Sequence, residues 1–286
     1  MPGPTSHSYF SQRLRLHYLD WGNPDAPPLL LIHGNRDHAH NWDWAAARLQ
    51  DRYHIIAPDL RGHGDSQWSA GSMYAPAEFV YDIAQLVHQQ ELAPLRIVAH
   101  SLGGNVALRY AGTFPEHVER LAVIEGWGAT VPAHPRPDAT ERMRRWIEAQ
   151  RSLAARQPRR YATLDDAYRR MLEANPHLSA EQARHLTIHG ANQNEDGTYS
   201  WKFDNYTHAS QLLDLPPEDV RTLWRNIACP VLLIAGSESW IRSGGDPKGL
   251  VDCFAHARHA VVEGAGHWVQ HDQLDHFLEL VEPFLA

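Results

Sequence analysis

The sequence predicts an α/β fold in which a mostly parallel central sheet is covered by helices and carries a helical cap insertion. Short apolar runs alternate with segments of helical periodicity, which is the pattern of strands joined by crossover helices. The segment 13–21 instead alternates between apolar and polar residues, so we expect an antiparallel starter strand there. The expected buried strands are 27–33, 53–59, 95–100, 120–126, 230–236 and 258–264.

One long segment, residues 127–226, interrupts this alternation. It has no strong strand pattern and contains helical patches such as TERMRRWIEAQRSLAA. We therefore predict a core made of residues 1–126 and 227–286, with residues 127–226 inserted as a helical cap. Within the cap, residues 136–170 hold ten arginines and five acidic residues. This indicates solvated helix faces, with attraction of anionic substrates as the alternative.

Composition argues against several classes of partner. The chain has 286 residues, of which 43% are hydrophobic and 21% are charged, as in a globular protein with a large core. Its net charge of −8 argues against nucleic acid as the main partner. No apolar run reaches membrane-spanning length, and the N-terminus lacks the pattern of a signal peptide. We therefore expect a cytoplasmic protein with no membrane partner.

Neither the cysteines nor the clustered histidines have the spacing of a familiar metal site. Cys229 and Cys253 lie outside any CxxC pattern. His33, His38 and His40 lie close together in HGNRDHAH, but without HExxH spacing. We therefore expect no metal and no organic cofactor.

A serine lies at the junction of a predicted strand and a predicted helix. Ser101 follows LRIVAH and precedes GGNVALRYA, with small residues at Ala99, Gly103 and Gly104. This is typical of a nucleophile elbow, whose sharp turn presents the serine hydroxyl at the carboxyl edge of the sheet. Ala99 replaces the first glycine of the usual G-x-S-x-G pattern. Considered alone, Ser101 is also compatible with a helix cap.

Two further motifs extend the pattern. HGN occupies residues 33–35 after one predicted strand, and PDLRGHGDS occupies residues 58–66 after the next. With these motifs the chain resembles the α/β-hydrolase superfamily over nearly its whole length. The resemblance implies an oxyanion hole formed by the backbone N–H groups of Asn35 and Leu102. It implies only a structural role for the RGHGDS loop.

The resemblance also implies a histidine base on the loop before the last helix. In VVEGAGHWV this residue is His267. We interpret His271 and His276, which follow it, as surface histidines.

The acid that should orient this histidine departs from the commoner pattern of the family. Ser239 stands where many relatives carry an aspartate, and Glu238 and Asp246 lie on the same loop. Some α/β-hydrolases, haloalkane dehalogenases among them, instead use a glutamate at the end of the strand after the nucleophile helix. The residue there is Glu125, in VIEGWG. We therefore predict Glu125 as the acid, with Glu238 and Asp246 as alternatives.

A serine nucleophile indicates acyl transfer to water. The dehalogenases have an aspartate nucleophile followed by tryptophan, whereas this chain has Ser101 followed by Leu102. The expected activity is therefore that of a carboxylesterase on small to medium hydrophobic esters, working through an acyl-enzyme. A thioesterase, a lactonase or a carbon–carbon bond hydrolase would use the same residues. The alternative of another class is a non-catalytic ligand-binding protein.

Tryptophans near the expected site loops predict an aromatic pocket beneath the cap. The candidates for lining this substrate pocket are Trp127, Trp240 and Trp268.

Overall fold

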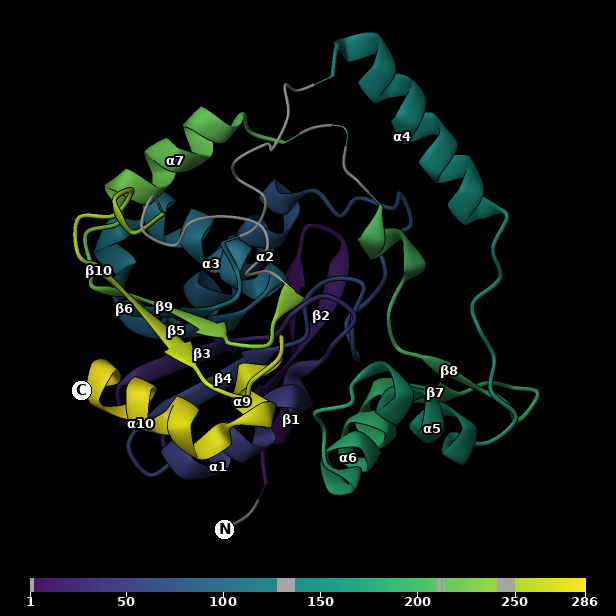
Figure 1. The fold of residues 1–286 in the computed structure, drawn as a ribbon, viewed down its shortest axis with the longest axis horizontal. Helices are drawn as coiled ribbons and strands as arrows, with labels where there is room; N and C mark the ends of the chain where they lie inside the picture. The colour runs from purple at the N-terminus through teal and green to yellow at the C-terminus, as the bar shows by residue number, and fades with distance from the viewer. Residues whose placement is uncertain (1–2, 128–136, 210–211, 213, 241–249) are drawn as a thin grey trace.

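The computed structural model describes residues 3–127, 137–209, 212, 214–240 and 250–286. Eight strands of these residues form one sheet in the order β1-β2-β4-β3-β5-β6-β9-β10 (Figure 1). β1, β2 and β4 pair antiparallel with one another in turn, and the other neighbours are parallel. The strands are β1 (Thr5–Ser11), β2 (Leu14–Asp20), β3 (Pro28–Ile32), β4 (His54–Pro58), β5 (Leu95–His100), β6 (Val118–Ile124), β9 (Val231–Gly236) and β10 (Ala257–Val262).

These strands confirm the predicted mostly parallel α/β fold. A strand lies at each predicted strand position, and the starter strand is antiparallel as expected. The sequence pattern did not predict β1. This edge strand buries only Tyr9 and Ser11, so it carries little of the apolar signal that identifies a strand.

Helices cover both faces of the sheet. Alternate strand residues face opposite layers, so Ile97 and Val98 of β5 belong to different apolar clusters. The helices on the Ile97 face are α2 (Pro76–Gln89), α3 (Leu102–Thr113) and α7 (Pro217–Asn226). Those on the Val98 face are α1 (Asp43–Leu49) and α10 (Leu274–Leu285). Among the described helices, none is long and apolar enough to cross a membrane.

The chain between β6 and β9 forms most of the insertion. Figure 1 shows α4, α5 and α6 to one side of the sheet, with α4 extending away from the core. The elements are α4 (Ala139–Ala154), α5 (Leu164–Ala174), α6 (Ala180–Gly190), β7 (Ala191–Gln193), β8 (Tyr199–Trp201) and η3 (Asn205–His208).

The helix α7 lies within the predicted cap range but packs on the core. Its Trp224 is 1% exposed within the main apolar cluster. It contacts α3 so closely that a Cβ at Gly112 would lie 2.2 Å from the Leu223 carbonyl oxygen. α7 therefore packs with the helices on this face of the sheet.

Candidate active site

Ser101 adopts the strained geometry of a sharp turn. It lies between β5 and α3 with φ 50° and ψ −115°, a conformation that L-residues rarely adopt. A Cβ at Gly103 would lie 2.5 Å from the carbonyl oxygens of Ile32 and His33, so strand and helix approach too closely for any side chain. Ser101 makes no capping hydrogen bond through its side chain. The structure therefore favours an elbow over a helix cap.

The VIEGWG segment brings its glutamate beside this turn. Glu125 follows β6, the neighbour of β5, and also has a positive φ of 52°. The next residue, Gly126, lies against the first turn of α3, where its added Cβ would be 2.5 Å from the Cα of Gly104. Glycine is required at this contact because the β6 loop and α3 meet through their backbones.

Ser101, His267 and Glu125 form a continuous hydrogen-bonded chain, named here the Ser–His–Glu chain. The Ser101 hydroxyl lies 3.0 Å from His267 Nε2, and His267 Nδ1 lies 2.9 Å from Glu125 Oε2. With Nδ1–H donating to the carboxylate, Nε2 is left to accept the serine proton. The Glu125 side chain is fully buried, whereas that of His267 is 24% exposed. The structure thus brings together the three residues that the sequence analysis selected.

The residue at the more usual acid position supports Glu125 rather than replacing it. Ser239 donates its hydroxyl hydrogen bond to Glu125 Oε2, and the Gly236 N–H donates to Oε1 at 2.9 Å. The Glu238 side chain is 57% exposed and lies 3.7 Å from His177. Asp246 lies outside the described residues. Two donors and the imidazole therefore fix the orientation of the Glu125 carboxyl group.

A second histidine, which the sequence analysis did not select, holds the His267 loop. His100 Nε2–H donates to the His267 carbonyl oxygen at 2.9 Å, and the two ring centroids are 4.7 Å apart. Burial, and then the neighbouring His267, hold the pKa of His100 well below its usual range. His100 is therefore neutral and can fix the loop without placing a cation beside His267. Its position directly before Ser101 was the available sequence signal.

Hydrogen bonds of His33 hold the loop after β3 against Ser101. The His33 Nδ1–H donates to the Gly34 carbonyl oxygen at 2.6 Å, and its Nε2 accepts from the Leu60 N–H at 3.0 Å. Burial lowers the pKa of His33 to about 3, with a smaller effect from His63, so the ring is neutral as these two bonds require. A Cβ at Gly34 would lie 3.1 Å from that of Ser101. The loop therefore carries Asn35 to the edge of the site.

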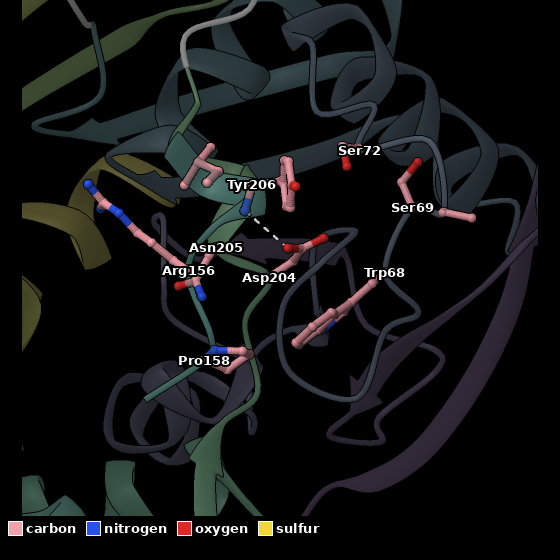
Figure 2. A pocket seen from close by; sticks show the side chains of 10 residues that line it. Trp68, Ser69, Ser72, Arg156, Pro158, Asp204, Asn205 and Tyr206 are labelled. Carbon is pink, nitrogen blue, oxygen red and sulfur yellow. Dashed lines mark hydrogen bonds between the residues drawn. The ribbon is translucent and has the colours of Figure 1, made fainter. Parts of the chain in front are cut away.

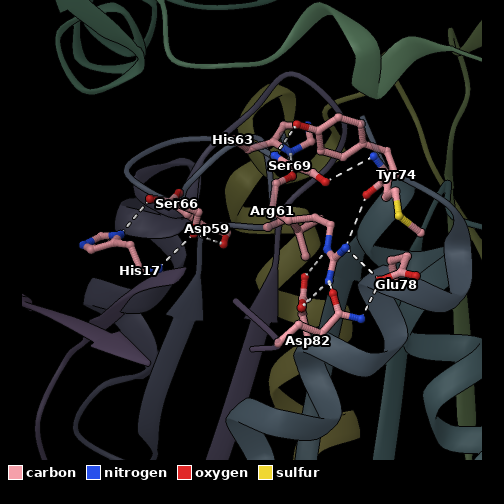
Figure 3. Close-up of polar contacts among 12 residues, drawn as sticks. His17, Asp59, Arg61, His63, Ser66, Ser69, Tyr74, Glu78 and Asp82 are labelled. Carbon is pink, nitrogen blue, oxygen red and sulfur yellow. Dashed lines mark hydrogen bonds and ion pairs between the residues drawn. The ribbon is translucent and has the colours of Figure 1, made fainter. Parts of the chain in front are cut away.

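The RGHGDS loop is built around buried charge pairs (Figure 3). Arg61 donates to both carboxylate oxygens of Asp82 at 2.6 and 2.7 Å and to Glu78 at 2.9 Å. Asp59 accepts from the backbone N–H of Asp65 at 2.8 Å. These contacts agree with the structural role expected for the loop.

A cavity of about 470 Å³ opens beside His267, between the core and the insertion. Asn35 and Trp268 line it from the core side, so one of the three predicted pocket tryptophans is present. Trp127 and Trp240 are not among its described lining residues; Trp127 packs against the core, and Trp240 lies 5.3 Å from the His267 ring and is 71% exposed. The other lining residues are Arg36, Pro158, Arg159, Tyr161, Arg170, Met171, Ala174, Asn175, Trp201, Phe203 and Asn205.

A second cavity, of about 320 Å³, lies between the 68–72 loop and the insertion (Figure 2). Trp68, Arg156 and Asp204 are among its lining residues, and Asp204 accepts a 3.0 Å hydrogen bond from the Tyr206 N–H. No member of the Ser–His–Glu chain is among its described lining residues. Of these two cavities, the one of about 470 Å³ has His267 among its described lining residues.

His271 is buried, which corrects the prediction of a surface histidine. It is 5% exposed and lies on α9 (Val269–Asp272). Its carbonyl oxygen accepts a 3.0 Å hydrogen bond from Gln182 of α6. Because α6 packs on this segment, the insertion covers a residue that the sequence placed at the surface. His276 is exposed, as predicted.

Comparison with known proteins agrees with this architecture. A sequence model of the alpha/beta hydrolase fold matches residues 27–274. Esterase Rv0045c of Mycobacterium tuberculosis is 27% identical over 275 residues, which cover 93% of this chain and 85% of the esterase. The solved thioesterase domain from the curacin biosynthetic pathway has a TM-score of 0.86 at 22% identity, covering 98% of this chain and 100% of that domain. E-2-(acetamidomethylene)succinate hydrolase gives a TM-score of 0.79 at 22% identity, with 98% of each chain covered. The two solved structures show the shared fold.

Proposed function

This chain belongs to the α/β-hydrolase family, and we propose that it cleaves carboxylic esters through an acyl-enzyme on Ser101. The observation that carries the proposal is the Ser–His–Glu chain beside a cavity of about 470 Å³. The 27% identity to a protein named an esterase supports the same reaction class.

The proposed mechanism assigns one role to each residue of the Ser–His–Glu chain. Ser101 Oγ attacks the ester carbonyl carbon while His267 Nε2 takes its proton, and the C–O bond then breaks as His267 protonates the departing alcohol. Water attacks the acyl-enzyme in the same way and releases the acid. Glu125 holds Nδ1–H toward itself and stabilises the imidazolium that forms in each half-reaction.

The proposed oxyanion donors are the backbone N–H groups of Asn35 and Leu102. Leu102 is the first residue of α3, so its N–H has no acceptor within the helix and lies at the positive end of the helix dipole. Asn35 follows Gly34, which packs against Ser101. Each such donor contributes about 3 kcal/mol to the barrier reduction in related chemistry.

The lining of the cavity supports a substrate that is both apolar and anionic. Tyr161, Met171 and Trp201 offer apolar surface for a small to medium acyl group. Arg159 and Arg170 also line the cavity, and its described lining residues include no carboxylate. We therefore favour an ester that carries a carboxylate or a phosphate away from the scissile bond.

A fluorophosphonate probe tests the serine hydrolase assignment directly. Wild-type protein should label, and Ser101→Ala should not, because the probe needs an activated serine. A folded wild-type protein that fails to label would instead be a ligand-binding member of the family.

A substrate panel then separates the ester from its alternatives. It should contain p-nitrophenyl esters of graded acyl length, acyl-CoA thioesters and lactones. We expect the highest kcat/KM on an oxygen ester of intermediate length. A clear preference for thioesters or lactones would replace the esterase proposal with that activity.

A further inference from the structure

Four metal-ligating side chains meet where the insertion packs on the core, away from the Ser–His–Glu chain. His40 lies in η1 (Ala39–Trp42) and Asp43 begins α1, whereas His185 and His189 lie on α6. One possible ligand atom from each residue lies within 4.8 Å of the others. Figure 1 shows α6 beside the α1 region of the core. The cluster therefore joins two parts of the chain that are about 145 residues apart.

The spacing within each element suits a shared ion. His185 and His189 are four residues apart on one helix, so both rings lie on the same face of α6. His40 and Asp43 are three residues apart where η1 passes into α1. The two pairs face each other, with His40 and His189 stacked at 3.7 Å between ring centroids.

The existing hydrogen bonds leave part of this cluster unexplained. His40 Nδ1 and His185 Nε2 lie 2.8 and 2.9 Å from Asp43 Oδ2. The other oxygen of the same carboxylate, Asp43 Oδ1, is buried and has no hydrogen-bond partner among the described residues. A buried, unpaired carboxylate oxygen is costly.

The composition of the cluster also suits metal binding. Three crowded imidazoles beside one carboxylate are unusual as a purely structural arrangement and ordinary as a metal ligand set.

We propose that His40, Asp43, His185 and His189 bind one divalent transition-metal ion, with zinc as the best match, that cross-links α6 to α1. A tetrahedral zinc site with bonds of about 2.0–2.1 Å places its ligand atoms about 3.3 Å apart. His40 Nδ1 and His185 Nε2, which are now hydrogen-bonded to Asp43 Oδ2, need to move only a few tenths of an ångström away from that oxygen to reach this spacing. Each imidazole that now donates to Asp43 would carry its proton on the other nitrogen. Imidazole ligands favour zinc, cobalt, nickel or copper over magnesium or calcium.

The ion would hold the insertion against the segment that carries the proposed base. α6 already contacts the core through the His38 side chain, which donates to the Leu186 carbonyl oxygen at 3.0 Å. It also contacts α9, which follows His267 by two residues. The ion would therefore stabilise the packing of α6 on the core, and none of its ligands belongs to the Ser–His–Glu chain.

Zinc titration of chelator-treated full-length protein tests this site without reference to activity. Calorimetry should give one tight zinc per chain, and the melting temperature should rise with zinc concentration, since the ion binds the folded state. His189→Ala should weaken binding by about 100-fold or more. The exposed His276→Ala serves as the matched control and should bind as wild type.

Cobalt(II) provides a readout that needs no variant. A tetrahedral site in the wild-type protein gives intense visible absorption, whereas adventitious surface binding gives the weak spectrum of an octahedral ion. The proposal is overturned if His189→Ala and His276→Ala bind zinc equally. It is also overturned if the wild-type protein shows neither a saturable single zinc nor the tetrahedral cobalt spectrum.

Discussion

The described residues contain two serine–histidine–carboxylate chains, and the comparison between them shows what a site needs beyond three correct side chains. In the second, named here the Ser–His–Asp chain, His17 Nε2 lies 2.7 Å from Ser6 Oγ and His17 Nδ1 lies 2.7 Å from Asp59 Oδ2. These distances are as short as those of the Ser–His–Glu chain, and His17 and Asp59 are visible in Figure 3. Hydrogen-bond geometry alone therefore does not distinguish the two.

The surroundings of the serines differ. Ser6 lies in the extended strand β1, opposite Leu19 of β2, and it is followed by more strand rather than by a helix. It therefore has no helix N-terminus to supply free N–H donors. Ser101 lies on a strained turn at the start of α3, beside the cavity that His267 lines. Free donors and a cavity, rather than the relay of side chains, distinguish the site.

The carboxylates of the two chains, Asp59 and Glu125, also differ in what they are expected to contribute. Asp59 accepts from the N–H groups of Ala39 and Asp65 as well as from His17, so it ties three segments together. Burial alone would raise the pKa of Asp59, but the hydrogen bond and charge of His17 outweigh it and hold that pKa well below the usual range. We therefore expect Asp59 to contribute to stability and Glu125 to contribute to the rate.

The largest expected contrast is between the two serines. Ser101→Ala should lower kcat by about 10⁶-fold, because it removes the nucleophile. Ser6→Ala should leave kcat and KM unchanged. Steady-state ester hydrolysis by both purified variants gives the comparison, and a loss of activity in the Ser6 variant at unchanged folding would contradict it.

The next contrast is between the carboxylates. Glu125→Gln should lower kcat by about 10⁴-fold with little change in KM, because the amide favours the wrong imidazole tautomer. Glu238→Gln is the control and should stay within about tenfold of wild type, as an exposed carboxylate would. If Glu238→Gln loses its activity while Glu125→Gln stays active, the acid of the site lies on the loop after β9 instead.

Asp59→Asn should show the opposite pattern. It breaks a buried pair with His17, so the free energy of unfolding should fall by about 3 kcal/mol while kcat stays near wild type. Urea unfolding and kinetics on the same preparation separate the two effects. If kcat falls by more than the fraction of unfolded protein can account for, Asp59 has a role in the reaction.

A smaller effect should appear as a dependence of stability on pH. Burial lowers the pKa of His33 to about 3 and, by the same main cause, that of His63 to about 4, from an ordinary value of 6.5. Their stabilising contribution is complete above pH 6.5 and is lost as the pH falls toward 3–4, because only the unfolded chain binds the protons. Each group contributes a slope of up to about 1.4 kcal/mol per pH unit. Urea unfolding of metal-free protein between pH 7 and pH 5 should show this decline, and a constant stability over that range would exclude it.

The smallest expected effect concerns the charge of the substrate. Arg159→Gln should raise KM about fivefold for an ester that carries a carboxylate and leave KM for a neutral ester of the same length unchanged. Arg145→Gln on α4, whose partner is Glu141, is the matched control outside the cavity. Equal KM changes for both esters would mean that Arg159 shapes the cavity without recognising charge.

The sequence alone determined the parts of this protein that depend on local pattern. Apolar runs identified the buried strands, because a strand that is covered on both faces needs apolar residues at nearly every position. The strand–serine–helix junction and its glycines identified Ser101, because only small residues allow β5 and α3 to approach. His267 and Glu125 followed from the resemblance to the α/β-hydrolases, which implies a histidine on the loop before the last helix and, in some relatives, a glutamate at the end of the strand after the nucleophile helix.

Only the tertiary structure decided which residues from distant segments meet. The sequence selected Glu125 but left Glu238 and Asp246 open as alternatives. What separates Glu125 from Glu238 is that β6 lies next to β5 and that Ser239 donates to Glu125, and neither pairing is visible in the local sequence. The burial of His271 and the packing of α7 on α3 depend in the same way on which surface another helix covers.

The histidine cluster makes the same point. The spacing of His40 and Asp43 is present in the sequence, but the spacing has no meaning until α6 brings His185 and His189 to it. Local sequence sets the backbone preference and the burial pattern of each segment. The histidine cluster and the Ser–His–Glu chain instead require atoms from distant segments to lie within a few ångströms of one another. That proximity is created by the order of strands in the sheet and by the docking of the insertion.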